Sequence, residues 1–242
     1  MSELRPKAAV ILGARNLGAA LATDLLGRDV RVAVVARTPS DLAILRARGA
    51  VTIPADASDP DSLAAALERA SSEIGRLDLI VNAVSPARPA VGATAFGGGP
   101  IAAATVDAME TWTVPVAQQT LVFLGAAARA LDGHGTLIQV TGAPARRTNP
   151  ERGLVSAGMA AVRALTHAAA QELRESGIHV ALLIVDGIIE SPKTEAMAAR
   201  LSPDALVRHD DVAHAVDFLA TQSQRGMTHE LVVTPVGGRW IP

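Results

Sequence analysis

Two glycines enclose a short loop that could bind phosphate. Gly13 and Gly18 begin and end the segment GARNLG, which follows the apolar run AAVIL (8–12) and precedes a helical pattern. In such a loop the first glycine permits a tight turn, the last permits close packing of the helix, and free N–H groups at the helix N-terminus can face a pyrophosphate. The sequence therefore predicts a dinucleotide site, and the alternative is a turn that binds no ligand. The intervening positions of the predicted site are Arg15, Asn16 and Leu17.

An arginine at the end of the second predicted strand indicates which dinucleotide is bound. Sites that prefer NAD usually place an acidic residue there, to hold the ribose 2′-hydroxyl. Here the run VRVAVVAR (30–37) ends in Ala36 and Arg37. Arg15 stands at the middle glycine position of G-x-G-x-x-G, and together with Arg37 it could hold a 2′-phosphate by charge-assisted hydrogen bonds. The sequence thus predicts NADP(H) in preference to NAD(H), and the alternative for Arg37 is a solvated surface arginine.

Few other side chains could do acid–base or nucleophilic chemistry. The chain has no cysteine and no tyrosine, and its six histidines are scattered without metal-ligand spacing, so no metal site is predicted. Asp186 follows an apolar strand and could be a general base, or a turn residue before Gly187. Thr141 could offer a hydroxyl, or only end its strand. The pair Arg146 and Arg147 could bind an anion, or be solvated.

The composition is that of a folded globular protein. Of the 242 residues, 49% are hydrophobic, and the formal net charge is −2, which gives no reason to expect binding to nucleic acid or to a membrane. The opening residues MSELRPK lack the apolar core of a signal peptide, and we find no apolar run of the roughly 18 residues that a membrane span needs. We therefore expect a cytoplasmic protein.

Apolar runs that alternate with helical patterns predict the elements that position these residues. Strands are predicted at 8–12, 30–37, 51–56, 77–84, 135–141, 179–185 and 230–236. Helices are predicted at 19–28, 38–49, 58–75, 114–131, 154–176 and 210–220. This order predicts an α/β fold with a doubly wound parallel sheet (a Rossmann fold) of about seven strands, in a single domain over 1–242. Residues 85–104 are expected to form a long loop, and 192–209 a short segment that covers the substrate.

In this order of elements the chain resembles the short-chain dehydrogenase/reductase family over nearly its full length. The matching pieces are the glycine loop, ADASD (55–59), VNAV (81–84), the helix that contains SAGMAAVRALTHAAAQELRES, and DGIIES (186–191). The resemblance implies that Asp56 and its neighbour contact the adenine, that the VNAV turn lies beside the adenosine, and that DGIIES holds the nicotinamide amide. The residues that it adds to the cofactor site are Asp56, Ala57, Asn82, Ala83, Val84, Gly187, Ile189 and Ser191.

The chain departs from this family where the family does its chemistry. There a Tyr exchanges a proton with the substrate oxygen, a Lys one helical turn later lowers the Tyr pKa and binds ribose, a Ser orients the carbonyl, and an Asn completes the proton relay. The matching positions here are Val155, Met159, Gly142 (with Thr141 one residue earlier) and Gln119, or Gln118 if the register slips. Because valine and methionine cannot relay a proton, the family's usual mechanism is excluded.

Departures also touch the expected cofactor site. The glycine loop has one residue fewer than the family's loop, Val84 replaces the glycine of the family's N-A-G turn, and Asp186 replaces the proline that precedes Gly187.

Three functions are compatible with these observations. The first is an NADP(H)-binding protein that has lost ordinary catalysis and acts as a nucleotide sensor or scaffold. The second is an atypical NADP(H)-dependent oxidoreductase with a rebuilt site, which reduces an activated acceptor such as an imine or enone or catalyses a non-redox reaction. The third is a structural subunit without nucleotide, which the retained Asp56, Asn82 and DGIIES disfavour.

The resemblance also implies a homodimer or homotetramer through helices 114–131 and 154–175, with an active paralogue as a possible partner.

Overall fold

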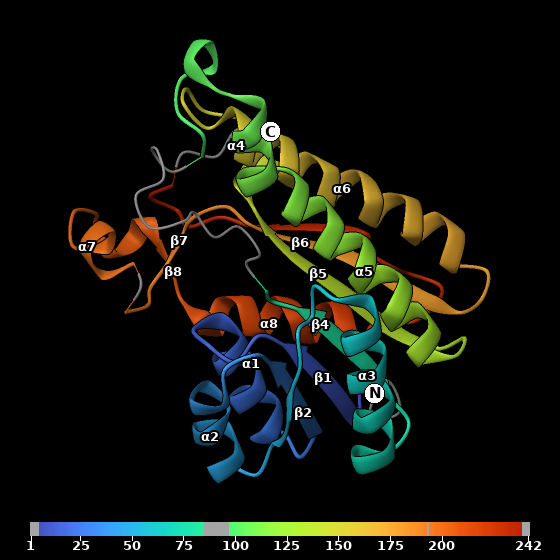
Figure 1. Cartoon of the computed structure of the whole chain (residues 1–242). Helices are drawn as coiled ribbons and strands as arrows, with labels where there is room; N and C mark the ends of the chain where they lie inside the picture. Colours follow the sequence, from blue (N-terminus) through green and yellow to red (C-terminus); the bar gives the residue numbers. More distant parts are fainter. Residues whose placement is uncertain (1–4, 85–96, 193, 239–242) are drawn as a thin grey trace.

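The computed structural model describes residues 5–84, 97–192 and 194–238. Its central feature is a parallel sheet of seven strands in the order β3-β2-β1-β4-β5-β6-β9 (Figure 1). The strands of this sheet are β1 (Ala8–Leu12), β2 (Arg31–Ala36), β3 (Val51–Pro54), β4 (Leu79–Asn82), β5 (Gly135–Gly142), β6 (Ile178–Val185) and β9 (Glu230–Val233). The predicted doubly wound sheet of about seven strands is therefore confirmed.

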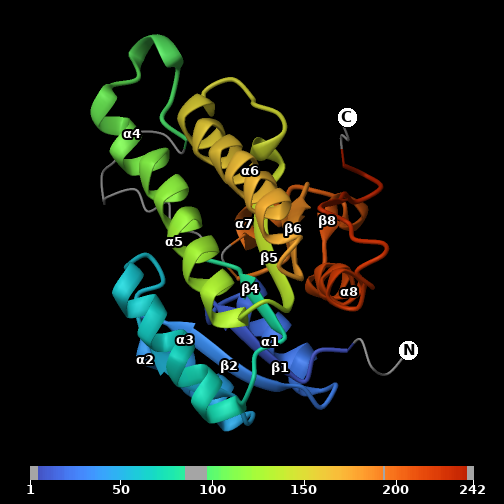
Figure 2. The ribbon, with the colours of Figure 1, turned by 90° about the vertical axis from the view of Figure 1, so that its right-hand side faces the viewer.

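Helices cover both faces of the sheet (Figure 2). The helices are α1 (Leu17–Leu26), α2 (Pro39–Ala47), α3 (Pro60–Ile74), α4 (Val106–Trp112), α5 (Val114–Leu131), α6 (Gly153–Leu173), α7 (Glu195–Ala198) and α8 (His209–Ala220). One apolar core joins the sheet to α1, α2 and α8, and a second joins the other face to α3, α5 and α6. Because both faces are covered, β1 and β6 are buried along their whole lengths, which explains why they are continuous apolar runs in the sequence.

Local sequence signals fix several helix ends. Asp59 caps α3, where its carboxylate accepts a hydrogen bond from the backbone N–H of Ser62 at 2.7 Å and Pro60 takes the first helical position. Pro115 lies in the first turn of α5, which begins at Val114 and ends at Leu131 as predicted.

Two predicted connections differ from the structure. The expected loop over 85–104 contains a 3₁₀ turn at Ile101–Ala103, and residues 85–96 lie outside the described part of the chain. Helix α4 follows this turn and was not predicted, because Thr105 caps it only one residue after the Ala-rich stretch ends. Within the predicted covering segment 192–209, α7 is followed by the short strand β8 (Leu206–Val207), which pairs with β7 (Ile188–Ile189) outside the main sheet.

One stretch meets the length and apolarity of a membrane span, which the sequence expectation missed. The stretch Val106–Leu131 comprises α4 and α5. Of its most apolar window, 44% is buried inside the domain, and α5 packs on both α3 and α6. A single stretch of this kind is weak evidence of a membrane span, because core helices pass the same test of length and composition.

The strand order places a crevice at the carboxyl ends of the two central strands, β1 and β4. The chain winds from β1 outward to β3 and then returns to the other side of β1 with β4. At such a reversal the loops that follow the two central strands separate, and ligands of doubly wound proteins bind there. Gly13 follows β1 and Ala83 follows β4, so both loops of the predicted cofactor site meet at this point.

Candidate functional site

The glycine loop is closed by two backbone approaches that only glycine allows. Gly13 has a φ of +104°, and a Cβ added there would lie 3.3 Å from the carbonyl oxygen of Ala83. A Cβ on Gly18 would lie 2.1 Å from the carbonyl oxygen of Gly13, far inside contact distance. The loop therefore folds tightly onto the start of α1, as the spacing of the two glycines predicted. Asn16, at φ +46°, leads into α1, and no side chain caps the free N–H groups of this helix.

The two arginines expected at the 2′-phosphate lie at the ends of neighbouring elements, and each already faces a carboxylate. Arg15 Nε is 3.5 Å from Asp41 Oδ2 at the start of α2. Arg37 lies just beyond β2, with Nη1 3.7 Å from Asp56 Oδ2. All four groups are partly solvated, so these pairs are weak, and a phosphate could replace the carboxylate partners.

Asp56 is positioned by its own loop. Its Oδ1 accepts a hydrogen bond from the N–H of Ser58 at 2.9 Å, and its own N–H donates to the hydroxyl of Ser62 at 3.0 Å. The next residue, Ala57, is buried, and its carbonyl oxygen accepts from the Gln119 side chain at 3.4 Å. The loop after β3 is therefore tied to helix α5 beneath the expected adenine site.

A network of three buried amides lies beneath the crevice. Asn82, at the end of β4, donates from Nδ2 to Gln119 Oε1 at 2.9 Å and to Gln139 Oε1 at 2.8 Å. Its Oδ1 accepts from the backbone N–H of Val84 at 3.2 Å, which orients the VNAV turn. All three side chains are at most 3% exposed. The network joins β4, α5 and β5, and it places Gln119 against Asn82.

Sequence reasoning missed Gln139. The signal was a single long polar residue inside the otherwise apolar strand GTLIQVT, where an uncompensated amide would be costly. Its Nε2 donates to the carbonyl oxygen of Val140 at 2.8 Å, and its Oε1 accepts from Asn82.

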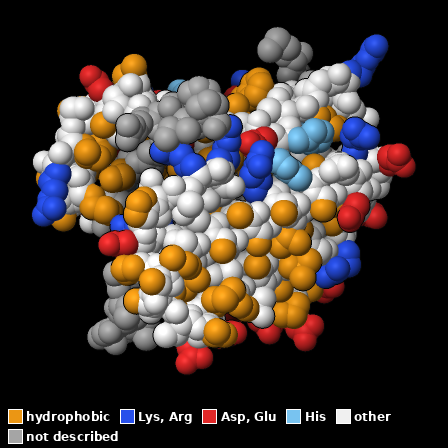
Figure 3. Space-filling model, turned by 90° about the horizontal axis from the view of Figure 1, so that it is seen from above, with side chains coloured by type: hydrophobic (Ala, Val, Ile, Leu, Met, Phe, Trp, Pro, Cys, Tyr) orange, Lys and Arg blue, Asp and Glu red, His pale blue; other side chains and the backbone are white. Residues whose placement is uncertain are grey.

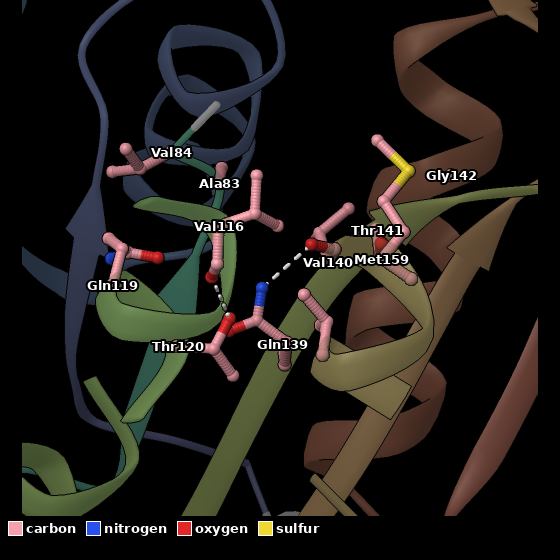
Figure 4. Close-up of a pocket in the computed structure, with 11 residues that line it drawn as sticks. Ala83, Val84, Val116, Gln119, Thr120, Gln139, Val140, Thr141, Gly142 and Met159 are labelled. Carbon is pink, nitrogen blue, oxygen red and sulfur yellow. Dashed lines mark hydrogen bonds between the residues drawn. The ribbon is translucent and has the colours of Figure 1, made fainter. Parts of the chain in front are cut away.

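A cavity of about 180 Å³ opens between the carboxyl ends of β4 and β5 and helices α5 and α6 (Figure 4). Apolar groups form most of its wall: Ala83, Val84, Val116, Val140, Gly142, Met159 and Val162. Its polar lining residues are Gln119, Thr120, Gln139 and Thr141. The Thr120 hydroxyl donates to the Val116 carbonyl oxygen of its own helix at 3.0 Å.

The positions that match the family's catalytic residues divide between this cavity and the core. Met159 lines the cavity, and its sulfur would be 3.8 Å from a Cβ on Gly142. Val155 is only 1% exposed and packs in an apolar cluster with Trp112 and Leu154. Position 155 therefore contributes to packing, and position 159 gives the cavity a thioether where an ammonium was expected from the resemblance.

Asp186 forms an internal ion pair. Its Oδ1 lies 2.5 Å from Nη2 of Arg147, its side chain is almost buried, and its backbone N–H donates to the Val233 carbonyl oxygen at 2.8 Å. The Arg147 guanidinium occupies this carboxylate, and Asp186 is not among the residues that line the cavity described above. The arrangement therefore favours a structural role for Asp186 over general-base catalysis.

The neighbouring arginine also has an internal partner. Arg146 Nε is 3.6 Å from Glu230 Oε1, and Glu230 binds Arg163 at 2.6 Å and His167 at 2.9 Å. Arg146 and Arg147 therefore each have a carboxylate partner inside the protein, so the expectation of a simply solvated pair is wrong, and anion binding by these arginines stays a prediction. Within the described chain, no cluster of three or more His, Asp or Glu side chains could hold a metal ion.

The segment DGIIES runs from β6 across the open end of the sheet. Gly187 has no space for a side chain, since a Cβ would lie 2.7 Å from Val207. Ile189 belongs to β7, and the hydroxyls of Ser191 and Thr194 lie 2.9 Å apart. The predicted cofactor residues of this segment therefore form a fixed turn beside β8.

Comparison with known proteins identifies similar chains over nearly the whole length. Residues 11–237 match the family model described as enoyl-(acyl carrier protein) reductase. The chain is 30% identical over 233 residues to cis-4-hydroxycyclohexanecarboxylate dehydrogenase of Sinomonas cyclohexanicum, with 90% of each chain covered.

Solved structures share the same fold. A short-chain dehydrogenase from Burkholderia cenocepacia J2315 in complex with NADP is 26% identical, with a TM-score of 0.74 over 96% of this chain and 97% of that one. An NADPH-bound short-chain oxidoreductase from Pseudomonas aeruginosa PAO1, described as containing an atypical catalytic center, is 22% identical, with a TM-score of 0.78 over 97% and 98%. The second likeness is evidence of fold alone.

Proposed function

The chain belongs to the short-chain dehydrogenase/reductase family, and from this membership we propose that it is an NADP(H)-binding oxidoreductase that works without a Tyr–Lys proton relay. The single observation that carries the proposal is that the crevice keeps the glycine loop expected to bind the cofactor but lacks the tyrosine and lysine of the proton relay. The glycine loop keeps both of the close approaches that a pyrophosphate cradle needs, at Gly13 and Gly18. The catalytic helix carries a core valine at position 155 and a methionine at position 159.

The residues present fit a dinucleotide. Gly18 lets the start of α1 pack closely on the loop, and the N–H groups there, which no side chain caps, would bind the pyrophosphate. Arg15 and Arg37 would hold the 2′-phosphate, and Asp56 with Ala57 would contact the adenine. The 26% identical short-chain dehydrogenase from Burkholderia cenocepacia J2315 was solved in complex with NADP, which supports this assignment. When bound, the cofactor would supply hydride, and the protein would supply orientation and electrostatics.

Within the described residues, the cavity lining contains no Tyr, Lys, His, Asp or Glu that could protonate an alkoxide. A site without such an acid suits an acceptor that needs little proton donation as the hydride arrives, such as an enone or a preformed iminium ion. The same absence favours the second candidate function, a nucleotide sensor that binds NADP(H) without turnover.

Calorimetric titration of the purified protein with NADPH, NADP, NADH and NAD tests this proposal first. We expect binding of the two phosphorylated forms and at least tenfold weaker binding of the others. A screen of enones and imines, followed by NADPH absorbance, then separates the oxidoreductase from the sensor. No binding of any of the four nucleotides at millimolar concentration would overturn both functions.

We further propose that the chain is cytoplasmic and forms a homodimer or homotetramer through α5 and α6. The outward face of α6 exposes a row of alanines (Ala157, Ala160, Ala164 and Ala168), and Leu121 on α5 is 62% exposed. Figure 3 shows hydrophobic side chains across the lower half of one face of the molecule, with charged groups mostly around them. Small residues permit close approach of helices, so this face suits a second copy. A monomeric mass by light scattering would contradict the assembly.

A further inference from the structure

We propose that Arg147 and Asp186 are a pair of positioning residues, which hold the turn after β6 in the form that receives the nicotinamide half of the cofactor. The inference rests on the proposed function and deepens it, because it assigns a task to two residues outside the cavity. Neither side chain lines that cavity, so we place their effect in the backbone of the turn rather than in a direct contact with the cofactor.

The strand order assigns the two halves of a dinucleotide to the two halves of the sheet. In doubly wound sheets of this order the dinucleotide lies across the point where the order reverses, with one mononucleotide over each half. The glycine loop after β1 and Arg37 after β2 assign the adenosine half to β1, β2 and β3. The nicotinamide half would therefore extend over the carboxyl ends of β4, β5 and β6, and Asp186 and Gly187 directly follow β6.

The turn that contains Gly187 has little room to move. A Cβ on Gly187 would lie 2.7 Å from Val207 and 2.9 Å from Pro235, so even the bare backbone packs against both neighbours. The backbone N–H of Asp186 donates to the Val233 carbonyl oxygen at 2.8 Å, which continues the ladder with β9. A proline at position 186, which the family resemblance would place there, fixes φ with its own ring but has no N–H to donate. Aspartate keeps this hydrogen bond but lacks the ring, so the restraint has to come from its side chain.

The ion pair with Arg147 supplies that restraint. Oδ1 of Asp186 lies 2.5 Å from Nη2 of Arg147, and the exposed fractions of the two side chains are 7% and 24%. Within the described part of the chain, Nε of Arg147 is buried and has no hydrogen-bond partner, so Asp186 is the one group there that compensates this guanidinium. Removal of either partner from such a pair leaves a poorly solvated charge without compensation, and each side chain therefore fixes the other.

The pair connects two loops that leave the sheet side by side. Strands β5 and β6 pair in parallel up to Gly142 and Val185, so the loop of Arg147 and the turn of Asp186 start at adjacent strand ends (Figure 1). The backbone of Arg147 is itself anchored, because its N–H donates to the Ala143 carbonyl oxygen at 3.1 Å in the 3₁₀ turn that follows β5. The ion pair thus ties the turn at the expected nicotinamide to a fixed point on the neighbouring loop.

Two nucleotides separate a positioning role from a purely structural one. NADPH and 2′-phospho-ADP-ribose share the adenine, the 2′-phosphate and the pyrophosphate, and only NADPH carries the nicotinamide. For Arg147→Met, calorimetry should show NADPH binding about tenfold weaker and binding of the fragment within about twofold of wild type, because only the nicotinamide half meets the displaced turn. The emission of bound NADPH, which reports the surroundings of its dihydronicotinamide ring, should move towards that of free NADPH.

The matched control is Arg163→Met, which breaks another internal ion pair on the same face of the sheet, where Arg163 Nε lies 2.6 Å from Glu230 Oε2. Its affinities for both nucleotides should stay at the wild-type values. Asp186→Asn breaks the proposed pair from its other side and should reproduce the loss seen in Arg147→Met. The double variant Arg147→Met/Asp186→Asn should lose no more NADPH affinity than either single variant, because the pair can be broken only once.

The wild-type protein offers a measurement that needs no variant. The NMR signal of the Arg147 Nε–H group, assigned through the backbone of the same residue, should shift when NADPH is added and stay in place when the fragment is added. This signal decides the matter even if Arg147→Met and Asp186→Asn fail to fold.

A loss confined to NADPH in Arg147→Met and Asp186→Asn, with a shift of the wild-type signal by NADPH alone, supports the proposal. Equal weakening of both nucleotides, or unchanged affinity for both, overturns it, because the pair would then serve the stability of the domain or no purpose at this site. A wild-type protein that binds the fragment as tightly as NADPH would overturn the positioning role and leave nucleotide binding intact. Binding of neither nucleotide would overturn the proposed function as well.

Discussion

Gly18 lies so close to the loop before it that a Cβ at this position would sit 2.1 Å from the carbonyl oxygen of Gly13. This approach sets the start of α1 directly over the end of β1, where the pyrophosphate is expected. A side chain could enter only if the loop moved, and the loop is held on its other side by Ala83. The relationship makes the glycine loop the most sensitive part of the proposed cofactor site.

The substitution Gly18→Ala is therefore expected to weaken NADPH binding by tenfold or more and to lower the free energy of unfolding by about 1–3 kcal/mol, as overpacking does. Gly27→Ala at the end of α1 is the matched control, because a Cβ there meets its neighbours only at 3.4 Å or more, with φ at −65°. Urea denaturation and calorimetry measure the two effects. A stable Gly18→Ala protein with wild-type NADPH affinity would contradict the assigned cradle.

The substitution Arg37→Gln tests the 2′-phosphate assignment. Loss of a charge-assisted hydrogen bond is expected to weaken NADPH binding by about ten- to a hundredfold and to leave NADH binding nearly unchanged. Arg69→Gln, on the exposed side of α3 where Arg69 pairs with Glu73, serves as the control. Calorimetric titration of both variants with both nucleotides gives the ratio. An equal loss for NADPH and NADH would show that Arg37 does not discriminate the phosphate.

Reinstating the family's tyrosine is expected to fail for a steric reason. Val155 is packed among Trp112 and Leu154 at 1% exposure, so Val155→Tyr should destabilise the protein by about 1–3 kcal/mol. Met159→Lys should be better tolerated, because position 159 lines the cavity and a lysine stem can extend along it. Urea denaturation compares the two single variants. If Val155→Tyr unfolds at the wild-type midpoint, the packing argument is wrong.

Glu230 is expected to contribute to acid sensitivity. Burial by itself would raise the pKa of Glu230, but the hydrogen bond and charge of Arg163, with the charges of His167 and Arg146, outweigh it and lower the pKa below its usual 4.5. A lowered pKa in the folded state means that the stabilisation is complete above about 4.5 and disappears as the pH falls through the folded-state value.

The matching measurement is the free energy of unfolding of Glu230→Gln and wild type between pH 7 and pH 3. Wild type should be the more stable near neutrality, and the difference should shrink as the solution becomes acidic. Glu68→Gln, at an exposed position of α3, should follow the wild-type curve. A constant difference between Glu230→Gln and wild type at every pH would exclude the ion-pair explanation.

The sequence by itself determined most of the strands and helices, and it showed that the usual tyrosine proton donor is missing. Buried strands are continuous apolar runs, and helix ends carry short-range signals, so β1 and the limits of α5 could be predicted from neighbouring residues alone. The spacing of Gly13 and Gly18 predicted the tight turn for the same reason, because both glycines lie in one loop. The absence of tyrosine from the whole chain excluded the usual proton donor without any structure.

Only the tertiary structure decided which distant side chains meet. Arg147 and Asp186 are 39 residues apart, and they pair because β5 and β6 end side by side. Gln139 gains its partner Asn82 because β4 and β5 are neighbours in register, with these two residues directly opposite each other. Composition and periodicity report how deeply a residue is buried, whereas the partner of a buried polar group depends on strand order and register, which are set by the packing of the whole domain.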